Sequence, residues 1–441
     1  MSKRPNIVYI NSHDTGRILS PYGYAVRTPK LQRFAEQGVT FRHCHDGGPT
    51  CSPARAALCT GAWPHVCGQL GLTHRGFNVH TPSWHLAHYL QEHGYCTAYS
   101  GQPNHMVDPE RVTAEQLGYQ HHLTGDATEA AETFIADYDR DEPFFLSVSY
   151  GVTHRAGPGF ATDPQPEDDP RWTLPPAPLA DTATIRADWA HLCSDVNTMD
   201  SYFGRVIDAI DQAGYGENTI IIATTDHGPA FPGMKCHCNV HGTGVFLIMR
   251  GPGFEGGKVI DGMVSQVDIY PTLCEALGTE KPAWLCGTAM QPLVDGSAEQ
   301  IHDEIYAEVT YHAAYQPMRA IRTPRHVYIK RFDERAAPVL PNCDRSPSKS
   351  SWVEVGWRDN PEEQLYDSFF DPQEMNNLAS SPAHAQIKAD LAARLDRWMR
   401  ETNDPLLNGP VPLPEGGLTN DQNGLNPNNE PGPCPTTLSA V

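Results

Sequence analysis

Short runs of apolar and β-branched residues alternate with amphipathic segments along the first two thirds of the sequence. The clearest run, TIIIAT at residues 219–224, is apolar on both faces, which is typical of a central strand in a parallel sheet. Further strands are expected at residues 7–10, 39–41, 95–100 and 144–149, and helices at 28–37, 82–93 and 199–213. This alternation predicts an α/β fold with a large, mostly parallel mixed sheet flanked by helices.

The pattern changes after about residue 300. Strands are expected at residues 301–309 and 320–332, with irregular proline-rich stretches between them and one amphipathic helix at 387–399. With 441 residues the chain is long enough for two cores. We therefore predict a large α/β domain at residues 1–305 and a smaller C-terminal α+β domain at 306–407. Residues 408–441 are rich in Pro, Gly and Asn and are predicted to form an extended or disordered tail.

The overall charge limits the partners that this chain can bind. Its 53 acidic and 32 basic residues give a net charge of −21, which repels nucleic acids, anionic membranes and long sulfated polymers. An anionic substrate must therefore be small or meet a local positive pocket. The N-terminal apolar stretch is too short for a signal peptide or a membrane span, so a cytoplasmic location is expected. The twelve cysteines lack framework spacing and are expected to be mostly free thiols.

Residues 51–55, Cys-Ser-Pro-Ala-Arg, have the pattern in which a cysteine is converted to formylglycine. Ser52 is a natural helix N-cap and Pro53 suits the first helical position, so backbone N–H groups and the helix dipole would face Cys51. Arg55 adds a permanent cation one turn later. The alternatives are a buried structural cysteine and a thiolate phosphatase, although the latter needs a longer phosphate cradle between Cys and Arg.

Acid and histidine pairs follow two of the predicted strands. His13-Asp14 comes after the first strand, and Asp226-His227 comes directly after residues 219–224. Because ligands bind at the carboxyl ends of strands in such sheets, these pairs predict a metal site. Carboxylates favour calcium, magnesium or manganese, and imidazoles shift the preference toward manganese or zinc. A single pair of this kind would more often be a solvated turn.

Two further histidines and one lysine lie just beyond predicted strands. His105 and His154 each follow a strand and are suited to proton transfer near neutral pH, although any one of 21 histidines can be a bystander. Lys235 is the first lysine after Lys30, which makes it a candidate anion ligand. The Cys236-His237-Cys238 stretch beside it has no second cysteine pair at zinc-finger spacing.

Together, these motifs and the segment VDIYPTL at residues 267–273 resemble the formylglycine-dependent sulfatases of the alkaline phosphatase superfamily over roughly residues 5–405. Within that family the closest likeness is to the sulfamidases, or N-sulfoglucosamine sulfohydrolases. It is carried by residues 153–155, 229–232, 316–319, 365–367, 371–372 and 377–379. The resemblance implies an alkaline-phosphatase-like fold and a hydrolase that releases sulfate from sulfate esters or sulfamates, as in glycosaminoglycan degradation.

The resemblance also implies a role for each candidate residue. The implied catalytic residues are Cys51, Arg55, His105, His154 and Lys235, and the implied metal ligands are Asp14, Cys51, Asp226, His227 and His13. Cys51 would be converted by a formylglycine-generating enzyme, and the aldehyde hydrate would attack sulfur and later expel sulfate. Arg55 would orient this nucleophile, His105 would handle its proton, His154 would protonate the leaving group and Lys235 would bind a sulfate oxygen. One divalent metal is implied, Ca²⁺ with Mn²⁺ as the alternative.

Three positions depart from the family pattern. His13 stands where these sulfatases usually have an aspartate, His227 where most have asparagine, and Pro103 where they have a lysine. The sulfate contact of that lysine is expected to be lost or supplied elsewhere, with Arg155 and Arg75 as the candidates. Residues His312, Tyr315 and Arg319 of the second domain are expected to line the sugar side of the site.

The expected substrate is a small N-sulfated or O-sulfated sugar. The alternative on the same frame is a phosphonate monoester or phosphodiester hydrolase, since histidine at the position of His227 also occurs in phosphonate monoester hydrolases of the superfamily. A third hypothesis is a non-catalytic binding protein with this fold. It is disfavoured because the candidate catalytic and metal-binding residues are all present together. A homodimer is compatible with the resemblance, whereas nucleic acid and membrane partners are not expected.

Overall fold

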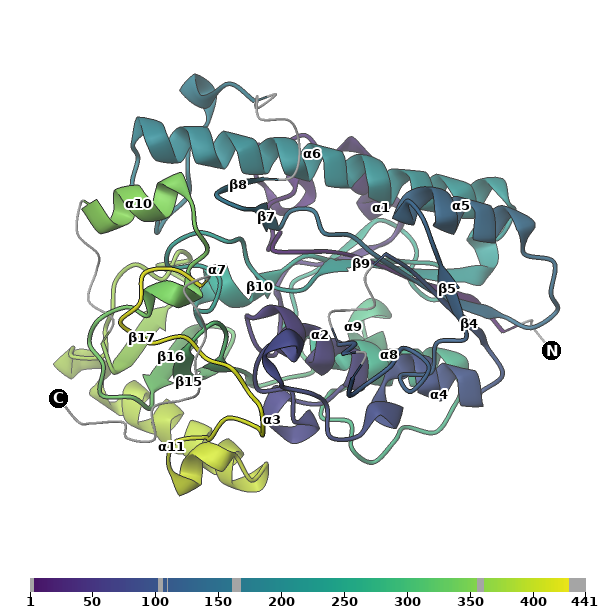
Figure 1. Ribbon diagram of the computed structural model, residues 1–441. Helices are drawn as coiled ribbons and strands as arrows, with labels where there is room; N and C mark the ends of the chain where they lie inside the picture. Colours follow the sequence, from purple (N-terminus) through teal and green to yellow (C-terminus); the bar gives the residue numbers. More distant parts are fainter. Residues whose placement is uncertain (1–3, 102–105, 109, 161–167, 355–360, 428–441) are drawn as a thin grey trace.

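The computed structural model describes residues 4–101, 106–108, 110–160, 168–354 and 361–427. Its centre is an eight-stranded sheet (Figure 1). In spatial order the strands are β12 (Lys258–Ile260), β2 (Val39–Phe41), β11 (Leu247–Arg250), β9 (Thr219–Thr225), β1 (Asn6–Ser12), β6 (Phe144–Ser149), β4 (Cys96–Gly101) and β5 (His121–Leu123). Neighbouring strands are parallel except where β11 pairs with β2 and β9. The predicted large, mostly parallel mixed sheet is therefore confirmed.

Helices cover both faces of this sheet (Figure 1). One face carries α1 (Pro29–Gln37), α5 (Ala127–Asp137) and α6 (Ala183–Gln212), and the other carries α2 (Cys51–Thr60), α4 (Leu86–Glu92) and α8 (Ile269–Leu277). Shorter elements complete this part: helices α3 (Pro64–Cys67), α7 (Val240–Thr243) and α9 (Gln291–Val294), the small sheet of β10 (Gly244–Val245), β3 (Cys44–His45) and β13 (Val264–Ser265), and the hairpin of β7 (Arg155–Ala156) and β8 (Gly159–Phe160).

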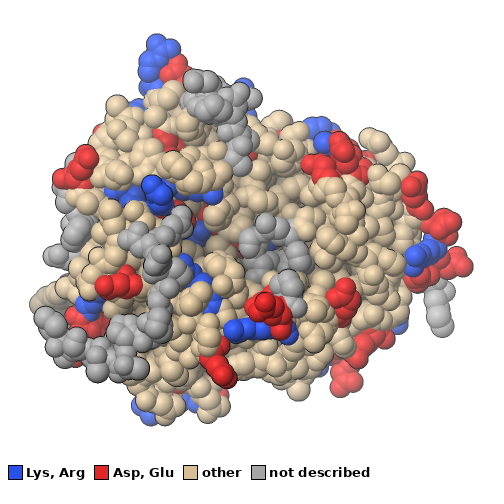
Figure 2. Space-filling model, viewed as in Figure 1, with Lys and Arg blue, Asp and Glu red and all other residues tan. Residues whose placement is uncertain are grey.

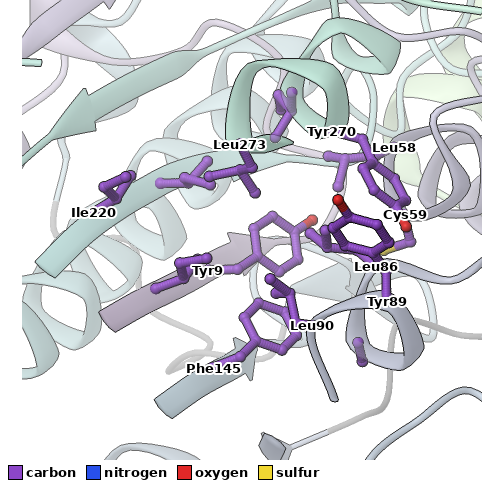
Figure 3. Close-up of a cluster of buried hydrophobic side chains, with 14 of the residues drawn as sticks. Tyr9, Leu58, Cys59, Leu86, Tyr89, Leu90, Phe145, Ile220, Tyr270 and Leu273 are labelled. Carbon is purple, nitrogen blue, oxygen red and sulfur yellow. The ribbon is translucent and has the colours of Figure 1, made fainter. Parts of the chain in front are cut away.

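Strand β9 shows why its sequence lacks a polar face. All seven of its residues are buried. Ile220 and Ile222 pack into the core beneath α2, α4 and α8, and Ile221 and Ala223 pack into the core beneath α1 and α6. Figure 3 shows the first of these cores, which also contains Tyr9 and Leu273. Burying each such side chain contributes about 1.5–3 kcal/mol, so the apolar run alone favours a central position in the sheet.

The C-terminal part has its own antiparallel sheet. Strands β14 (Ile305–Tyr311), β15 (Tyr315–Arg322), β16 (His326–Arg331) and β17 (Glu363–Asp367) follow one another in space, and α11 (Ala385–Glu401) packs on β15 and β16. Helix α10 (Pro347–Glu354) packs on α6. The single strand predicted at 320–332 was wrong, because residues 323–325, which include Pro324, turn the chain between β15 and β16.

Helix α6 is also much longer than the predicted helix at 199–213. Its first half carries buried polar residues, Asp188, Ser194 and Asp195, which break the apolar periodicity that the prediction relied on. Asp188 is buried because it pairs with Arg155 from β7. When the buried face of a helix contains a charged residue that pairs with a distant partner, the sequence does not show the apolar periodicity of an amphipathic helix.

Several short 3-10 helices connect these elements. They span Ser20–Tyr22, Thr73–Arg75, Pro82–Trp84, Pro170–Trp172, Gly216–Asn218, Gln266–Asp268, Leu340–Asn342, Pro382–His384 and Pro405–Asn408. The segment after them, residues 409–427, crosses the protein without a regular helix or strand. It is held by backbone hydrogen bonds from Leu418 to Arg75 and from Asn420 to Ala313.

Two further features concern the whole described chain. Its eleven described cysteines are free, as the sequence predicted. Among the described helices none combines the length and the hydropathy that crossing a membrane requires.

Candidate active site

The carboxyl ends of three neighbouring parallel strands bring the predicted residues together. Strand β1 pairs with β9 up to Ser12 and Thr225, so His13-Asp14 and Asp226-His227 leave the sheet side by side. Strand β6 pairs with the other side of β1 and leads to His154. The two acid and histidine pairs therefore share one edge of the sheet, as the strand-end argument predicted.

Backbone contacts fix the two turns against each other. Asp14 has a positive φ of 56°, an uncommon conformation for a residue other than glycine, and its N–H donates to Oδ1 of Asp226 at 2.8 Å. Gly16 donates its N–H to the carbonyl of His227 at 2.9 Å. Gly16 has φ of 61°, and a Cβ there would lie 2.9 Å from Cδ of Pro229, so the close approach of the turns requires glycine.

Five buried residues could share one metal ion: His13, Asp14, Cys51, Asp226 and His227. Each offers one ligand atom, and these atoms all lie within 4.8 Å of one another. Nδ1 of His227 lies 2.9 Å from the carbonyl of Gly228, which can only accept, so Nδ1 carries the hydrogen and Nε2 has a lone pair.

That lone pair faces negative charge. Nε2 of His227 lies 3.3 Å from Oδ1 of Asp14 and 3.7 Å from Oδ2 of Asp226, and it has no hydrogen-bond partner in the structure. A buried lone pair beside two carboxylates is stabilised by a cation between them. The residues present therefore fit a divalent metal.

Neighbouring basic side chains lower the pKa of both carboxylates. Burial opposes the charge of Asp14, but Lys235, His13 and His227 outweigh it and hold the pKa of Asp14 well below its usual range. Burial likewise opposes the charge of Asp226, yet His13, His227 and Arg55 lower its pKa. The His13 ring is itself buried, which lowers its pKa to about 4, so it is a neutral imidazole at pH 7.

Arg55 holds the cluster to the sheet. Its guanidinium is 1% exposed and donates to Oδ2 of Asp226 at 3.2 Å, to Oγ of Ser149 at 3.2 Å and to the carbonyl of Ser12 at 3.1 Å. One side chain thus joins the ends of β1, β6 and β9. An arginine that is turned toward a carboxylate in this way does not form the phosphate cradle of a thiolate phosphatase.

Cys51 lies at the first residue of α2, with Thr50 as the N-cap. The predicted start, with Ser52 as N-cap and Pro53 as first helical residue, was therefore wrong. Ala54 donates its N–H to the carbonyl of Thr50, and the Ser52 hydroxyl accepts from the N–H of Thr73 instead of capping the helix. The helix N-terminus still faces the cluster. Burial raises the pKa of the Cys51 thiol, so this side chain is a poor thiolate nucleophile.

Lys235 and His154 both lie beside the cluster. Nζ of Lys235 is 2.9 Å from Oδ2 of Asp14 and 3.0 Å from Oδ2 of Asp344. The ring of His154 packs edge-on against His13 with 4.4 Å between centroids. Nδ1 of His154 donates to the carbonyl of Arg155 at 2.8 Å, which leaves Nε2 available for proton transfer. His105 lies outside the described residues.

Asp344 is a residue of this site that sequence reasoning missed. It belongs to the smaller domain and follows the 3-10 helix Leu340–Asn342 in an irregular proline-rich stretch with no periodicity. Burial opposes its charge, but Lys235 lowers the pKa of Asp344 to about 2. His312 is also buried beside Lys235, and both effects lower its pKa. Asp344 and His312 are thus the contributions of the smaller domain to the lysine side of the site.

The other predicted substrate-binding residues are bound by protein groups. Arg155 makes two hydrogen bonds of 2.9 Å to Asp188 and stacks on Phe231, so its guanidinium has a structural role and does not replace the missing lysine. Arg75 donates to the carbonyls of Ala313 and Pro427.

Tyr315 and Arg319 lie in the interior of the smaller domain. The Tyr315 hydroxyl accepts from the N–H of Val411, and its ring packs on Tyr311. Arg319 is fully buried and paired with Asp404 and Glu308. Both residues are corrected from substrate contacts to structural residues, because protein groups fill their surroundings.

Replacing Arg319 with methionine is expected to lower the free energy of unfolding by about 3–5 kcal/mol, because two buried carboxylates would lose their cation. Chemical denaturation measures this. The matched control is Arg325→Met, since Arg325 is 56% exposed in its pair with Asp367 and should cost no more than about 1 kcal/mol. Equal effects of the two substitutions would contradict this description of Arg319.

The sulfatase family model matches residues 5–279 of the chain. An ulvan-active sulfatase of Formosa agariphila is 26% identical over 95% of this chain and 78% of its own length. The human N-sulphoglucosamine sulphohydrolase is 26% identical over 88% of both chains. The crystal structure of the phosphonate monoester hydrolase of Agrobacterium radiobacter shares the fold, with a TM-score of 0.67 at 19% identity, over 90% of this chain and 96% of that one. This chain therefore belongs to the sulfatase family and is a hydrolase of sulfate esters or sulfamates.

Proposed function

We propose that this protein uses a formylglycine made from Cys51, together with one divalent metal, to release sulfate from a small N-sulfated or O-sulfated sugar. The observation that carries the proposal is the position of Cys51 at a helix N-terminus, within 4.8 Å of two carboxylates and two imidazoles. A plain thiol whose pKa is raised by burial would be inert there. A formylglycine-generating enzyme is the maturation partner that the proposal requires.

The side chains that could act as ligands affect which metal the site would bind. Asp14, Asp226 and His227 would hold it, with His13 and Cys51 beside them. We propose Ca²⁺, in line with the family resemblance, and keep Mn²⁺ as the alternative that the imidazole donors favour. When bound, the metal would supply positive charge that lowers the pKa of a neighbouring hydroxyl and polarises sulfate oxygens.

The protein's own groups surround the reacting position. Formylglycine at position 51 would supply two geminal hydroxyl groups in place of one thiol. Arg55 fixes the strand ends against Asp226, so the position of the nucleophile relative to the cluster is set before substrate binds. Lys235 would supply positive charge for a sulfate oxygen, and Nε2 of His154 would give a proton to the departing nitrogen or oxygen.

The sugar side of the proposed substrate would lie toward the smaller domain. A groove of about 500 Å³ there is lined by Pro158, Arg345, Ser346, Lys349 and other residues of α10, and Arg345 directly follows Asp344. On the face shown in Figure 2, basic side chains gather over the C-terminal part of the chain, whereas the opposite edge is more acidic. Local positive charge of this kind supports binding of a small anion by a protein whose net charge is −21.

Asp344 should weaken anion binding at Lys235, because its carboxylate lies 3.0 Å from the ammonium group. Replacing Asp344 with asparagine is expected to make inorganic sulfate an inhibitor that binds about tenfold more tightly, since one like charge is removed beside the anion. Inhibition constants for sulfate measure this, with Asp303→Asn, an exposed carboxylate just before β14, as the control. Weaker inhibition in Asp344→Asn would contradict the placement of the substrate anion at Lys235.

Phosphonate monoester hydrolysis is the second candidate. It is supported by the shared fold with a phosphonate monoester hydrolase and by His227 among the candidate metal ligands. Both reactions need a nucleophile, a metal and a proton donor around a tetrahedral anion. The two differ in the group that is released, so only substrates can separate them.

Two measurements on one preparation test the proposal. Mass spectrometry of the peptide that contains Cys51, from protein made in its native organism, should show formylglycine, and an unmodified thiol would overturn the mechanism. The same preparation is then assayed with N-sulfoglucosamine, an aryl sulfate and a phosphonate monoester. Fastest turnover of the N-sulfated sugar is expected, and fastest turnover of the phosphonate would favour the second candidate instead.

A further inference from the structure

A cavity of about 310 Å³ lies behind the turns that carry the metal-site residues. Its walls come from the segment after β1, the turn after β9, strand β3 and the smaller domain, and they include Arg17, Arg42, His43, His45, His241 and Arg322. None of Cys51, Arg55, His154, Lys235 and Asp344 lines it, nor do the candidate metal ligands. The cavity is therefore a separate space from the proposed catalytic site.

The positive charge in this wall exceeds the negative charge. Arg42 pairs with Asp261, the one carboxylate in the lining, and Arg322 pairs with Glu374 just outside it. Arg17 makes no ion pair with any carboxylate in the described part of the chain, and donates to the carbonyl of Cys44 and to Nε2 of His45. The charge of Arg17 is thus unbalanced.

Two guanidinium nitrogens at the cavity lack acceptors. Nε of Arg17 and Nη2 of Arg322 are buried, and neither has a hydrogen-bond partner in the structure. Arg322 is 7% exposed. Burial and the charge of Arg322 both lower the pKa of Arg17, which indicates that the two cations lie close enough to repel each other. Buried donors without acceptors, on two cations that repel, are costly unless a group with oxygen acceptors lies between them.

We propose that this cavity is a second binding site, for a sugar-sized ligand that carries one carboxylate, sulfate or phosphate group. The anionic oxygens would accept from the free N–H groups of Arg17 and Arg322, as arginine favours. Apolar and aromatic side chains such as Ile18, Tyr24 and Met263 also line the wall and would contact the body of the ligand. The volume is at the lower end of the range for small-molecule sites.

The position of the cavity gives its ligand a route to the catalytic turns. Arg17 follows Gly16, whose N–H binds the carbonyl of His227, and Pro229 lies in the cavity wall two residues after His227. Met234, also in the wall, precedes Lys235. A bound anion would therefore contact the backbone segments that carry Asp14, His227 and Lys235.

Isothermal titration calorimetry on the full chain tests the proposal, with inorganic sulfate, inorganic phosphate and glucuronate as separate probes. We expect at least one of them to bind, and Arg17→Met to weaken that binding at least tenfold, since a charged hydrogen bond is lost. His43→Glu is the second variant, because His43 is exposed at the wall and the substitution adds an acid without disturbing the core. It should weaken the same binding several-fold.

Two variants separate this site from the rest of the protein. Arg205→Met removes an arginine from a surface pair with Glu132 and should leave binding unchanged. Lys235→Met removes the catalytic anion contact, so binding of a probe at the catalytic site should be lost while binding at the cavity remains. Binding that is lost in Lys235→Met and kept in Arg17→Met and His43→Glu would place the anion at the catalytic site and overturn the proposal. Failure of all three probes to bind would overturn it as well.

Discussion

Replacing Cys51 with alanine will lower sulfate release by roughly 10⁴- to 10⁶-fold, the loss typical of removing a covalent nucleophile. Cys51→Ser will be no better, because serine supplies one hydroxyl group where the formylglycine hydrate supplies two. The substituted protein should fold normally, since Cys51 has a small side chain at the first position of α2. Steady-state rates and circular dichroism on the same samples measure both effects.

The matched control is Cys59→Ala. Cys59 lies in the same helix, is 3% exposed and is surrounded by core residues. Its removal should cost some stability through the small cavity that it leaves, but should change turnover only slightly. If Cys51→Ala kept more than about a hundredth of the wild-type rate, the residue would not be the nucleophile.

Removing divalent metal with a chelator will lower both activity and the melting temperature, and adding Ca²⁺ or Mn²⁺ back will restore them. A ligand at one hundred times its dissociation constant stabilises the folded state by about 2.7 kcal/mol. Without a cation, Nε2 of His227 faces Asp14 and Asp226 inside the protein, 3.3 and 3.7 Å from their oxygens. Comparing the two added metals by differential scanning fluorimetry will also show which the site prefers.

Asp226→Asn should abolish the metal-dependent shift in melting temperature and reduce activity by at least about a thousandfold, because it removes a proposed metal ligand and the carboxylate that holds Arg55. The control is Asp208→Asn, a partly exposed carboxylate that pairs with Lys30 and Arg33 on the surface. It should leave the shift intact. If the chelator changed neither the stability nor the activity of the wild-type protein, the result would contradict the proposed metal site.

The secondary structure was predictable wherever one element buried one clear face. Strand β6 (Phe144–Ser149) and helix α1 (Pro29–Gln37) match their predictions closely, since an apolar run and an amphipathic period with a terminal glycine carry local signals. The first half of α6 and the division between β15 and β16 were not predicted. Asp188 breaks the helical pattern for a partner, Arg155, that lies 33 residues away.

The candidate site was also predictable from the sequence only in part. His13, Asp14, Cys51, Asp226 and His227 could be named in advance, because parallel strands must end at one edge and motifs mark those ends. Asp344 could not, because it lies in an irregular stretch with no periodicity, and only the packing of the smaller domain brings it to Lys235.

The sequence by itself determined the fold class and named the candidate nucleophile and the candidate metal-site residues, because each depends on local patterns and on the direction of parallel strands. Only the tertiary structure decided which arginines are structural. From the sequence alone, Arg155 and Arg319 look like substrate ligands. In the structure, Asp188 and Asp404 neutralise the charges of these two arginines inside the protein. The tertiary structure also left Arg17 without such a partner at its cavity. The physical reason is that the charge state and accessibility of a side chain depend on groups brought together from distant parts of the chain.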